Sequence, residues 1–272
     1  TKFKPRILFE EIGRNTAAAI CLSLIDCLQF YDDPKVIIFS SDHFIYDEQK
    51  FISSIKESFF YADNYGWTLF GSKPDYPSTG YGYIGVFRKN NFFEVEKFIE
   101  KPNLKKAKEY YSKNNYFWNS GIFLGKAKKM LETINLHTPQ ILKSASITYK
   151  KSLKNKNELI FKKEFLSDIK KTSIDYAILE HEKNIGFQML DCGWSDVGSW
   201  DTLTKVLDKF NMKKNYSHLE IDTKNISVIS DTCNIATIGV KDLIIVKNKE
   251  NILILKKGHS QKVINLIDNF KI

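Results

Sequence analysis

The stretch Gly193–Trp200 reads Gly-Trp-Ser-Asp-Val-Gly-Ser-Trp and places one carboxylate, that of Asp196, in a tight turn between two glycines and two tryptophans. Glycine permits close backbone approach, and tryptophan supplies rigid walls around the acid. Such an acid either caps the turn or binds a cation carried by a phosphate. Because Asp is common in turns, this segment alone leaves the two interpretations about evenly balanced.

A second acid far upstream favours the cation interpretation. Asp42 lies in Ser40-Ser41-Asp42-His43, directly after the apolar run of Lys35–Ser40, which is typical of a parallel strand buried on both faces. Ligands of open α/β sheets bind beyond the carboxyl ends of the strands, although an isolated Asp-His pair is more often structural. Since Asp42 and Asp196 each follow an apolar run, we predict that they meet at one Mg²⁺.

Composition limits the class of protein. The chain of 272 residues is 43% hydrophobic and 27% charged, which is ordinary for a globular protein of one large domain or two. No signal-peptide pattern opens the given sequence, and no apolar stretch approaches the roughly 18 residues of a membrane span. The four cysteines lack metal-ligand spacing and are interpreted as buried thiols of a reducing cytosol. We therefore expect a cytoplasmic protein without membrane contact.

The formal net charge of +9 raises the question of nucleic-acid binding. The lysines are spread along the chain and gather mainly at 147–171, and no basic stripe is interleaved with aromatic residues. We therefore expect no nucleic-acid partner. A modest positive field that attracts phosphorylated small molecules is the milder interpretation.

The first segment of the chain predicts a strand, a polar loop and a capped helix. Arg6–Phe9 favours a strand, and Asn15 or Thr16 is placed to cap the helix that follows. This simple account explains the loop residues Gly13 and Asn15. It does not explain why a Glu, an Arg and an Asn converge at a helix N-terminus, where anions and polar bases bind well.

Three further features in the first half are ambiguous when each is taken alone. The glycines of Thr79–Ile84 either let a ligand lie against the backbone or mark a bulge. Glu100 and Lys101 end a predicted strand and could be an edge-strand charge pair. Asn119 is an amide among aromatic residues and needs partners, which could be backbone groups or sugar hydroxyls.

The second half predicts a change of architecture. We expect the Lys-rich region of about 126–170 to be helical, and the capping-box pattern of Thr172–Asp175 gives Asp175 a structural role first. From about 218, short alternating strands end in a predicted amphipathic helix at Ser260–Phe270. We place the domain boundary in the polar segment Asp208–Ser217, which gives domains 1–210 and 211–272. The second is a β-rich appendage for packing or oligomerisation and a candidate for homodimer formation.

Seven ordered blocks of the chain resemble the mannose-1-phosphate guanylyltransferases, within the larger family of sugar-nucleotide pyrophosphorylases. No single block is specific, but the ordered set across nearly the whole chain is. The blocks are Glu10–Ala17, Ser41–His43, Thr79–Ile84, Val95–Pro102, Trp118–Phe123, Ser173–Ala177 and Gly193–Trp200.

The resemblance implies an α/β nucleotide-diphosphosugar transferase fold, Rossmann-like, with a mixed, mostly parallel sheet, helices on both faces and a small C-terminal β-helix-like module. It implies an enzyme of polysaccharide biosynthesis that forms GDP-mannose and pyrophosphate from GTP and mannose 1-phosphate with Mg²⁺. By the same resemblance the site residues fall into three groups: the catalytic, metal-binding pair Asp42 and Asp196; Glu10, Gly13, Arg14 and Asn15 near the guanine end of the nucleotide; and Gly82, Glu100, Lys101 and Asn119 around mannose 1-phosphate.

The chain departs from the family pattern in two places. The N-terminal glycine-rich signature loop that grips the nucleotide phosphates is absent from a sequence that begins at Thr1, and Glu11 stands where the family usually has proline. We therefore expect an N-terminally truncated chain that is weakly active or inactive alone. The alternatives are a transferase for another nucleotide or sugar phosphate, disfavoured by the Glu-x-x-Gly-Arg-Asn-Thr block, and a non-catalytic sugar-nucleotide-binding or regulatory subunit.

Overall fold

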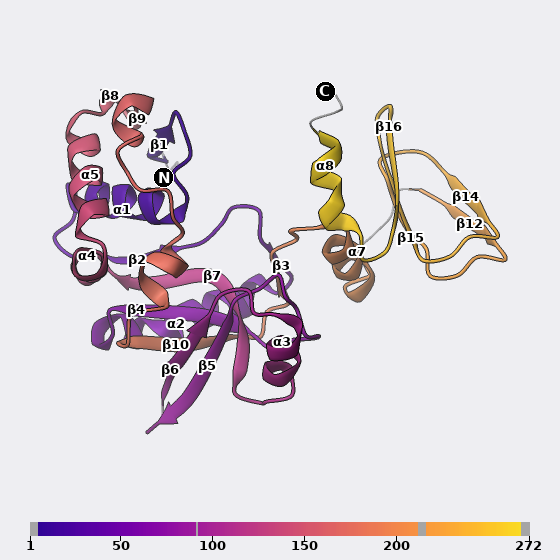
Figure 1. Cartoon of the computed structure of the whole chain (residues 1–272), viewed down its shortest axis with the longest axis horizontal. Helices are drawn as coiled ribbons and strands as arrows, with labels where there is room; N and C mark the ends of the chain where they lie inside the picture. The colour runs from indigo at the N-terminus through magenta and orange to yellow at the C-terminus, as the bar shows by residue number, and fades with distance from the viewer. Residues whose placement is uncertain (1–4, 91, 212–215, 268–272) are drawn as a thin grey trace. The chain divides into compact units, whose positions relative to one another are not determined.

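The computed structural model describes residues 5–90, 92–211 and 216–267, which form two compact units (Figure 1). Unit 1 comprises residues 1–41 and 47–192, and unit 2 comprises residues 42–46 and 193–272. Among the helices of the described ranges, none is both long and apolar enough to cross a membrane.

Unit 1 is built on a six-stranded mixed sheet, as the resemblance implied, but the sheet is not mostly parallel. In spatial order the strands are β2 (Lys35–Ile38), β7 (Tyr116–Lys126), β4 (Trp67–Ser72), β10 (Ile185–Leu190), β6 (Phe92–Ile99) and β5 (Tyr83–Lys89). β10 pairs in parallel with β4, and the other pairings are antiparallel, so that β2, β4, β10 and β5 run in one direction and β6 and β7 in the other. The prediction that Lys35–Ser40 is a fully buried parallel strand was wrong: β2 is half-buried, ends the strand order and pairs antiparallel with β7.

Helices cover both faces of this sheet. The helices α1 (Thr16–Cys27), α4 (Ala127–His137) and α5 (Pro139–Lys150) pack on one another on one side (Figure 1), where the main hydrophobic core lies. Phe187 of β10 points into that core. A Cβ at the neighbouring Gly186 would instead lie 2.5 Å from the ring of Tyr61 in α2 (Glu48–Asn64). Since successive strand residues face opposite sides, α2 covers the other face.

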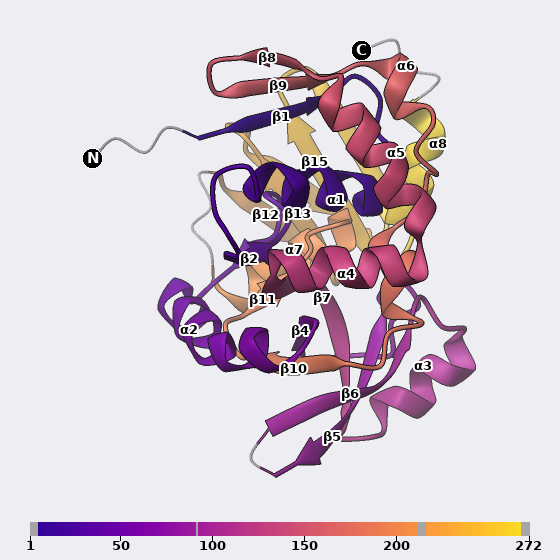
Figure 2. The same ribbon diagram turned by 90° about the vertical axis from the view of Figure 1, so that its left-hand side faces the viewer.

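A second sheet corrects the expectation that 126–170 is helical throughout. It holds β1 (Ile7–Glu10), β9 (Glu158–Phe161) and β8 (Leu153–Asn155), which lie side by side in Figure 2. β1 pairs in parallel with β9, and this partner from the far N-terminal segment overrides local helix preference. The short helix α6 (Lys163–Leu166) follows, and α3 (Leu104–Tyr111) lies between β6 and β7 in the chain.

Unit 2 contains the predicted β-rich module. Residues of β12 (His218–Ile221) pair in parallel with those 17 positions later in β14 (Ile235–Ile238), and β13 (Ser227–Ser230) pairs likewise with β15 (Leu243–Asn248). This constant offset is one coil of a β-helix. β16 (Asn251–Lys256) closes the sheet as an antiparallel edge.

The C-terminal end of unit 2 differs from the prediction in detail, and its N-terminal end is defined by packing. The closing helix begins as a 3₁₀ turn (Ser260–Val263) and continues as α8 (Ile264–Ile267), while the predicted end at Phe270 lies outside the described residues. The compact units divide between residues 192 and 193. The reason is that β11 (Trp194–Ser195) pairs with β3 (Phe44–Ile45), and α7 (Trp200–Lys209) packs on β13 and β15.

Candidate functional site

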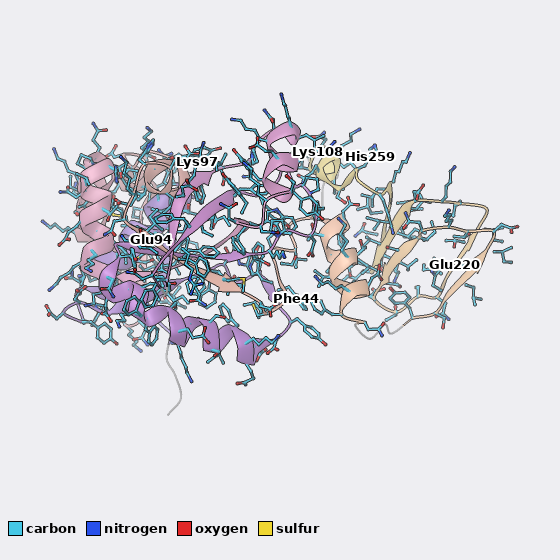
Figure 3. All side chains as sticks on the ribbon, turned by 90° about the horizontal axis from the view of Figure 1, so that it is seen from below. Phe44, Glu94, Lys97, Lys108, Glu220 and His259 are labelled. Carbon is cyan, nitrogen blue, oxygen red and sulfur yellow. The ribbon has the colours of Figure 1, made fainter. Side chains whose placement is uncertain are left out.

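The structure brings Asp42 and Asp196, the acid pair, together around one histidine in unit 2. Phe44, labelled in Figure 3, pairs antiparallel with Ser195, so the next positions outward, His43 and Asp196, face each other. Trp194 donates its indole N–H to Nδ1 of His43 at 3.3 Å. Burial lowers the pKa of His43, while the charges of Asp42 and Asp196 oppose that shift and must therefore lie near the ring.

The turn that carries Asp196 is strained. Val197 adopts φ +47°, in the left-handed region, which is a true outlier for a β-branched residue. Asp196 Oδ1 accepts the backbone N–H of Gly198 at 3.2 Å, and Ser195 Oγ accepts that of Val197 at 3.2 Å. Asp196 therefore does cap its turn. A carboxylate offers about four lone-pair positions, so capping leaves room for a cation.

The acid pair has the chemistry that Mg²⁺ selects. Magnesium takes hard oxygen ligands from one or two carboxylates and completes its shell with water and phosphate oxygens. Among the residues that the structure describes, no group of three or more His, Cys, Asp and Glu side chains forms a closed metal cage. Two carboxylates fit a metal that is shared with a phosphate substrate.

In unit 1, the structure brings together four of the residues predicted to hold the sugar phosphate. A Cβ at Gly82 would lie 2.6 Å from Glu100 Oε2 and 3.3 Å from the Cβ of Asn119, so only glycine fits beside them. Asn119 also donates its backbone N–H to the Gly82 carbonyl at 2.8 Å. Lys101 Nζ lies 3.2 Å from Glu100 Oε1.

The surroundings of the Glu100 carboxylate bury it and raise its pKa. Its side chain is only 10% exposed, whereas that of Lys101 is 60% exposed. Burial raises the pKa of Glu100, the charge of Asp175 raises it further, and Lys101 partly offsets both. Lys101 itself has φ +44°, a backbone conformation that points to local constraint at the strand end.

Asp175 makes a contact that the capping-box pattern did not predict. It begins the π-helix Asp175–Leu179, and Oδ1 accepts the Asn119 side-chain amide at 3.0 Å. Burial raises its pKa, and hydrogen bonds from Ser173 and Asn119 oppose the shift. We call Gly82, Glu100, Lys101, Asn119 and Asp175 the Gly82 cluster. The resembling block at Ser173–Ala177 was the one signal that could have assigned Asp175 to it.

The loop 10–16 carries an orphaned acceptor. Glu10 ends β1 opposite Phe161, and its Oε1 is buried without a hydrogen-bond partner among the described residues. Burial also raises the pKa of Glu10. Because buried polar atoms nearly always find partners, this oxygen points to an N–H donor on a ligand.

In the rest of the loop, Gly13 has open space around it, whereas Arg14 and Asn15 are held by hydrogen bonds. An added Cβ at Gly13 would meet no atom within 4 Å. Asn15 caps α1 by accepting the Thr16 N–H at 2.8 Å, as predicted, at φ +69° and ψ 177°. Arg14 donates to the carbonyls of Ile169 (2.7 Å) and Ser167 (3.1 Å), so part of its guanidinium serves the fold.

The loop and the Gly82 cluster are linked within unit 1. Ala17 donates its N–H to the Thr172 carbonyl at 3.3 Å, and Thr16 Oγ1 accepts the Ile174 N–H at 2.9 Å. Asp175 follows directly. The start of α1 is thus tied to the segment that presents Asp175 to Asn119.

Comparison with known proteins adds an independent line of support. The family model described as nucleotidyl transferase matches residues 1–213, and that described as the MannoseP isomerase/GMP-like β-helix domain matches residues 216–270. The chain is 34% identical over 275 residues to a putative mannose-1-phosphate guanylyltransferase of Vibrio cholerae, covering 98% of this chain and 58% of the relative. It is 32% identical over 284 residues to the mannose-1-phosphate guanylyltransferase of Escherichia coli K12, covering 99% and 59%. The chain therefore spans less than two thirds of these relatives.

Solved structures show the same architecture. A crystal structure described as a mannose-1-phosphate geranyltransferase from Thermus thermophilus superposes with a TM-score of 0.82 at 25% identity, covering 95% of this chain and 76% of that one. One described as a mannose-6-phosphate isomerase from Helicobacter pylori gives a TM-score of 0.63 at 31% identity, covering 69% of this chain and 74% of that one.

Proposed function

The chain belongs to the nucleotidyl transferase family, among the mannose-1-phosphate guanylyltransferases, and from this premise we propose that it forms GDP-mannose and pyrophosphate from GTP and mannose 1-phosphate. The observation that carries the proposal is the Gly82 cluster. It gathers a buried carboxylate, an oriented amide and an exposed lysine around a glycine that leaves the backbone open. These are the groups that a sugar carrying a phosphate requires.

The reaction needs little acid–base catalysis from the protein. A phosphate oxygen of mannose 1-phosphate attacks the α-phosphorus of GTP in line, the bond to the β-phosphate oxygen breaks, and pyrophosphate leaves. The nucleophile is already ionised near neutral pH, so no general base is needed. Catalysis therefore depends on alignment and on neutralising charge at the phosphates.

In this proposal the Gly82 cluster orients the sugar phosphate. Glu100 accepts from sugar hydroxyls, and the exposed ammonium of Lys101 reaches a phosphate oxygen. Asn119 is held by Asp175, so its amide presents a fixed direction to the sugar. Each contact is specific because the groups are positioned before substrate arrives.

Asp42 and Asp196 would hold Mg²⁺, which supplies Lewis-acid neutralisation of phosphate charge when bound. The protein's own contribution is rigidity. The strained Val197 and the hydrogen bonds of Ser195 and Asp196 hold the carboxylate in its turn.

Recognition of the base is assigned to Glu10. Its orphaned oxygen can accept an N–H, and guanine presents two adjacent donors on one edge. Leaving this oxygen unpaired would cost free energy, so a base with donors in that place is favoured.

The decisive test is pyrophosphate release with mannose 1-phosphate, Mg²⁺ and each of the four nucleoside triphosphates. It should be run on this chain and on a version extended to the length of its relatives. Pyrophosphate release with GTP, but not with the other three nucleotides, from either length of the chain supports the proposal. Release with a different nucleotide would mean that the site recognises another base. Binding of GDP-mannose without any release would favour a sugar-nucleotide-binding subunit.

Self-association stays a prediction. Ile252 and Ile254 lie on one face of β16, and their exposed fractions are 64% and 61%. Light scattering on the wild type and on an Ile252→Ser, Ile254→Ser variant tests whether a homodimer forms there.

A further inference from the structure

We propose that the segment Lys162–Ile169 sets the conformation of the loop 10–16, and that Glu11, Lys162 and Arg14 are positioning residues for nucleotide binding rather than contacts to the nucleotide. The proposal rests on the proposed function, because it assigns the loop to the nucleotide. It concerns contacts within unit 1 alone.

One end of the segment is held by Glu11. Its Oε1 lies 2.6 Å from Lys162 Nζ, and its Oε2 accepts the backbone N–H of Lys163 at 2.8 Å. Both bonds lower the pKa of Glu11, so the carboxylate is ionised near neutral pH. Glu11 thereby satisfies a backbone donor at the start of α6, which has no intrahelical partner.

The other end is held by Arg14. Its Nε and one Nη donate to the carbonyls of Ile169 and Ser167, which follow the end of α6. These two bonds use the planar fork of the guanidinium, which lysine could not reproduce. Two charged residues of one short loop, Glu11 and Arg14, therefore hold the two ends of the same helical turn. We call these contacts the bracket.

The loop needs this external support. Asn15, next to Arg14, adopts φ +69° and ψ 177°, a conformation that is nearly confined to glycine. Gly13 lies in open space and resists no change of conformation. Such a loop keeps one shape only when surrounding contacts over-determine it, and Glu11 and Arg14 provide contacts on both sides of Gly13.

The consequence concerns Glu10, the orphaned acceptor. Its backbone is fixed on one side by the pairing of β1 with β9, and the Glu11 N–H donates to the Phe161 carbonyl at 3.2 Å. On the other side it depends on the loop. Loosening the bracket should therefore weaken nucleotide binding without touching the acid pair, which raises KM for the nucleotide and leaves kcat nearly unchanged.

The test is a double-mutant cycle on the exposed pair. We expect Glu11→Ala to raise KM for GTP about three- to ten-fold and Lys162→Ala to raise it less, because the bond from the Lys163 N–H to Glu11 survives in Lys162→Ala. The double variant should raise KM no further than Glu11→Ala does, since the Lys162 bond is already lost in that variant. Glu11→Gln should stay near wild type, since the amide oxygen still accepts from Lys163. Glu109→Ala is the matched control, because Glu109 of α3 forms a similar exposed pair, at 2.7 Å, with Lys113 just after the helix.

Two outcomes would overturn the proposal. If the two single effects multiply in the double variant, then Glu11 and Lys162 act separately and Lys162 contacts the nucleotide. If KM for GTP is unchanged in Glu11→Ala, the bracket does not position the loop.

Hydrogen exchange separates this proposal from the proposed function. In Glu11→Ala we expect faster exchange of the amides of 11–16, with an unfolding midpoint equal to that of Glu109→Ala. This measurement needs no turnover, so an inactive wild type would count against the transferase and still decide the positioning. Unchanged exchange in Glu11→Ala would refute the positioning role even in an active enzyme.

Discussion

The side-chain amide of Asn119 donates a hydrogen bond to the carboxylate of Asp175 at 3.0 Å, joining residues 56 positions apart. Asn119 belongs to β7, and Asp175 begins the π-helix. The same amide group uses its oxygen to accept the Gly121 N–H at 3.1 Å. Both ends of the Asn119 side chain are therefore engaged, and Asp175 decides which way its N–H groups point.

Removing Asp175 should release the Asn119 amide. We expect Asp175→Ala to raise KM for mannose 1-phosphate about ten-fold or more, because a half-buried donor left without its acceptor costs about 1–3 kcal/mol. KM for GTP should change less than two-fold. Initial rates with either substrate varied measure both values, and the exposed Glu132→Ala is the control. An unchanged KM for the sugar phosphate would remove Asp175 from the site.

Adding one methyl group at Gly82 should have a similar effect by another route. In Gly82→Ala the Cβ would sit 2.6 Å from Glu100 Oε2, so the carboxylate must move. Overpacking of this kind costs about 1–3 kcal/mol, which we expect as weaker binding of mannose 1-phosphate. Gly80→Ala is the matched control, since its Cβ would meet only Ser78 Oγ at an ordinary 3.6 Å. Equal affinities in the two variants would contradict the placement of Gly82.

The buried Glu100 should lower the stability of the fold at neutral pH while it contributes to binding of mannose 1-phosphate. Burial and Asp175 raise its pKa, so the folded state binds the Glu100 proton more tightly than the unfolded chain does. Stability from this group is therefore fully present at low pH and is lost as pH rises from the ordinary value through the raised one.

Glu100→Gln removes that titration. We expect the Tm of Glu100→Gln to exceed the wild-type Tm at pH 7, with the difference shrinking toward pH 4, while affinity for mannose 1-phosphate falls. Thermal unfolding across this pH range, with calorimetric binding at pH 7, measures both. A variant that is less stable at pH 7 would show that the exposed Lys101 pair outweighs the burial of Glu100.

Asp26 is a structural acid that the site does not use. It is 4% exposed and accepts from Arg6 Nε (2.5 Å), Arg6 Nη2 (2.9 Å) and Tyr149 Oη (2.7 Å). Burial, followed by the bond to Asp26, raises the pKa of Tyr149 to about 12. We expect Asp26→Ala to lower the free energy of unfolding by about 3 kcal/mol, because it leaves a partly buried guanidinium unpaired. Urea unfolding measures this, with the exposed Asp32→Ala as control. A loss equal to that of the control would mean that water replaces Asp26.

Much of the fold was accessible from the sequence because it is encoded locally. The alternation of Ile235–Ile238 and its neighbours predicted the β-rich module, and the polar loop before Thr16 predicted the start of α1. The hairpin of β8 and β9 was missed because its stability comes from pairing with β1, about 150 residues earlier. A Lys-rich segment carries no local sign of such a partner.

In the candidate site too, features encoded locally were predicted, and features that depend on long-range contacts were not. Asp42 and Asp196 were predicted as neighbours from their positions after apolar runs, and the pairing of β3 with β11 brings them to one histidine. The capping-box pattern of Thr172–Asp175 predicted a structural role for Asp175, and the contact of Asp175 with Asn119 is not visible in that local pattern. For Arg14, two backbone carbonyls of a distant segment take part of the side chain. Such long-range contacts require coordinates.

The acid pair gives the last prediction. In Asp196→Asn the amide oxygen can still accept the Gly198 N–H, so the turn keeps its capping bond and the variant should fold with an unchanged Tm. The hard anionic oxygen is lost, and Mg²⁺ binds a neutral amide more weakly than a carboxylate. In the active form of the enzyme we expect pyrophosphate release to fall at least about 100-fold and not to recover at high Mg²⁺. The control is Glu220→Gln on β12, a carboxylate of the same unit labelled in Figure 3, whose removal should leave the rate unchanged. Normal turnover in Asp196→Asn would leave this residue with its turn-capping role alone.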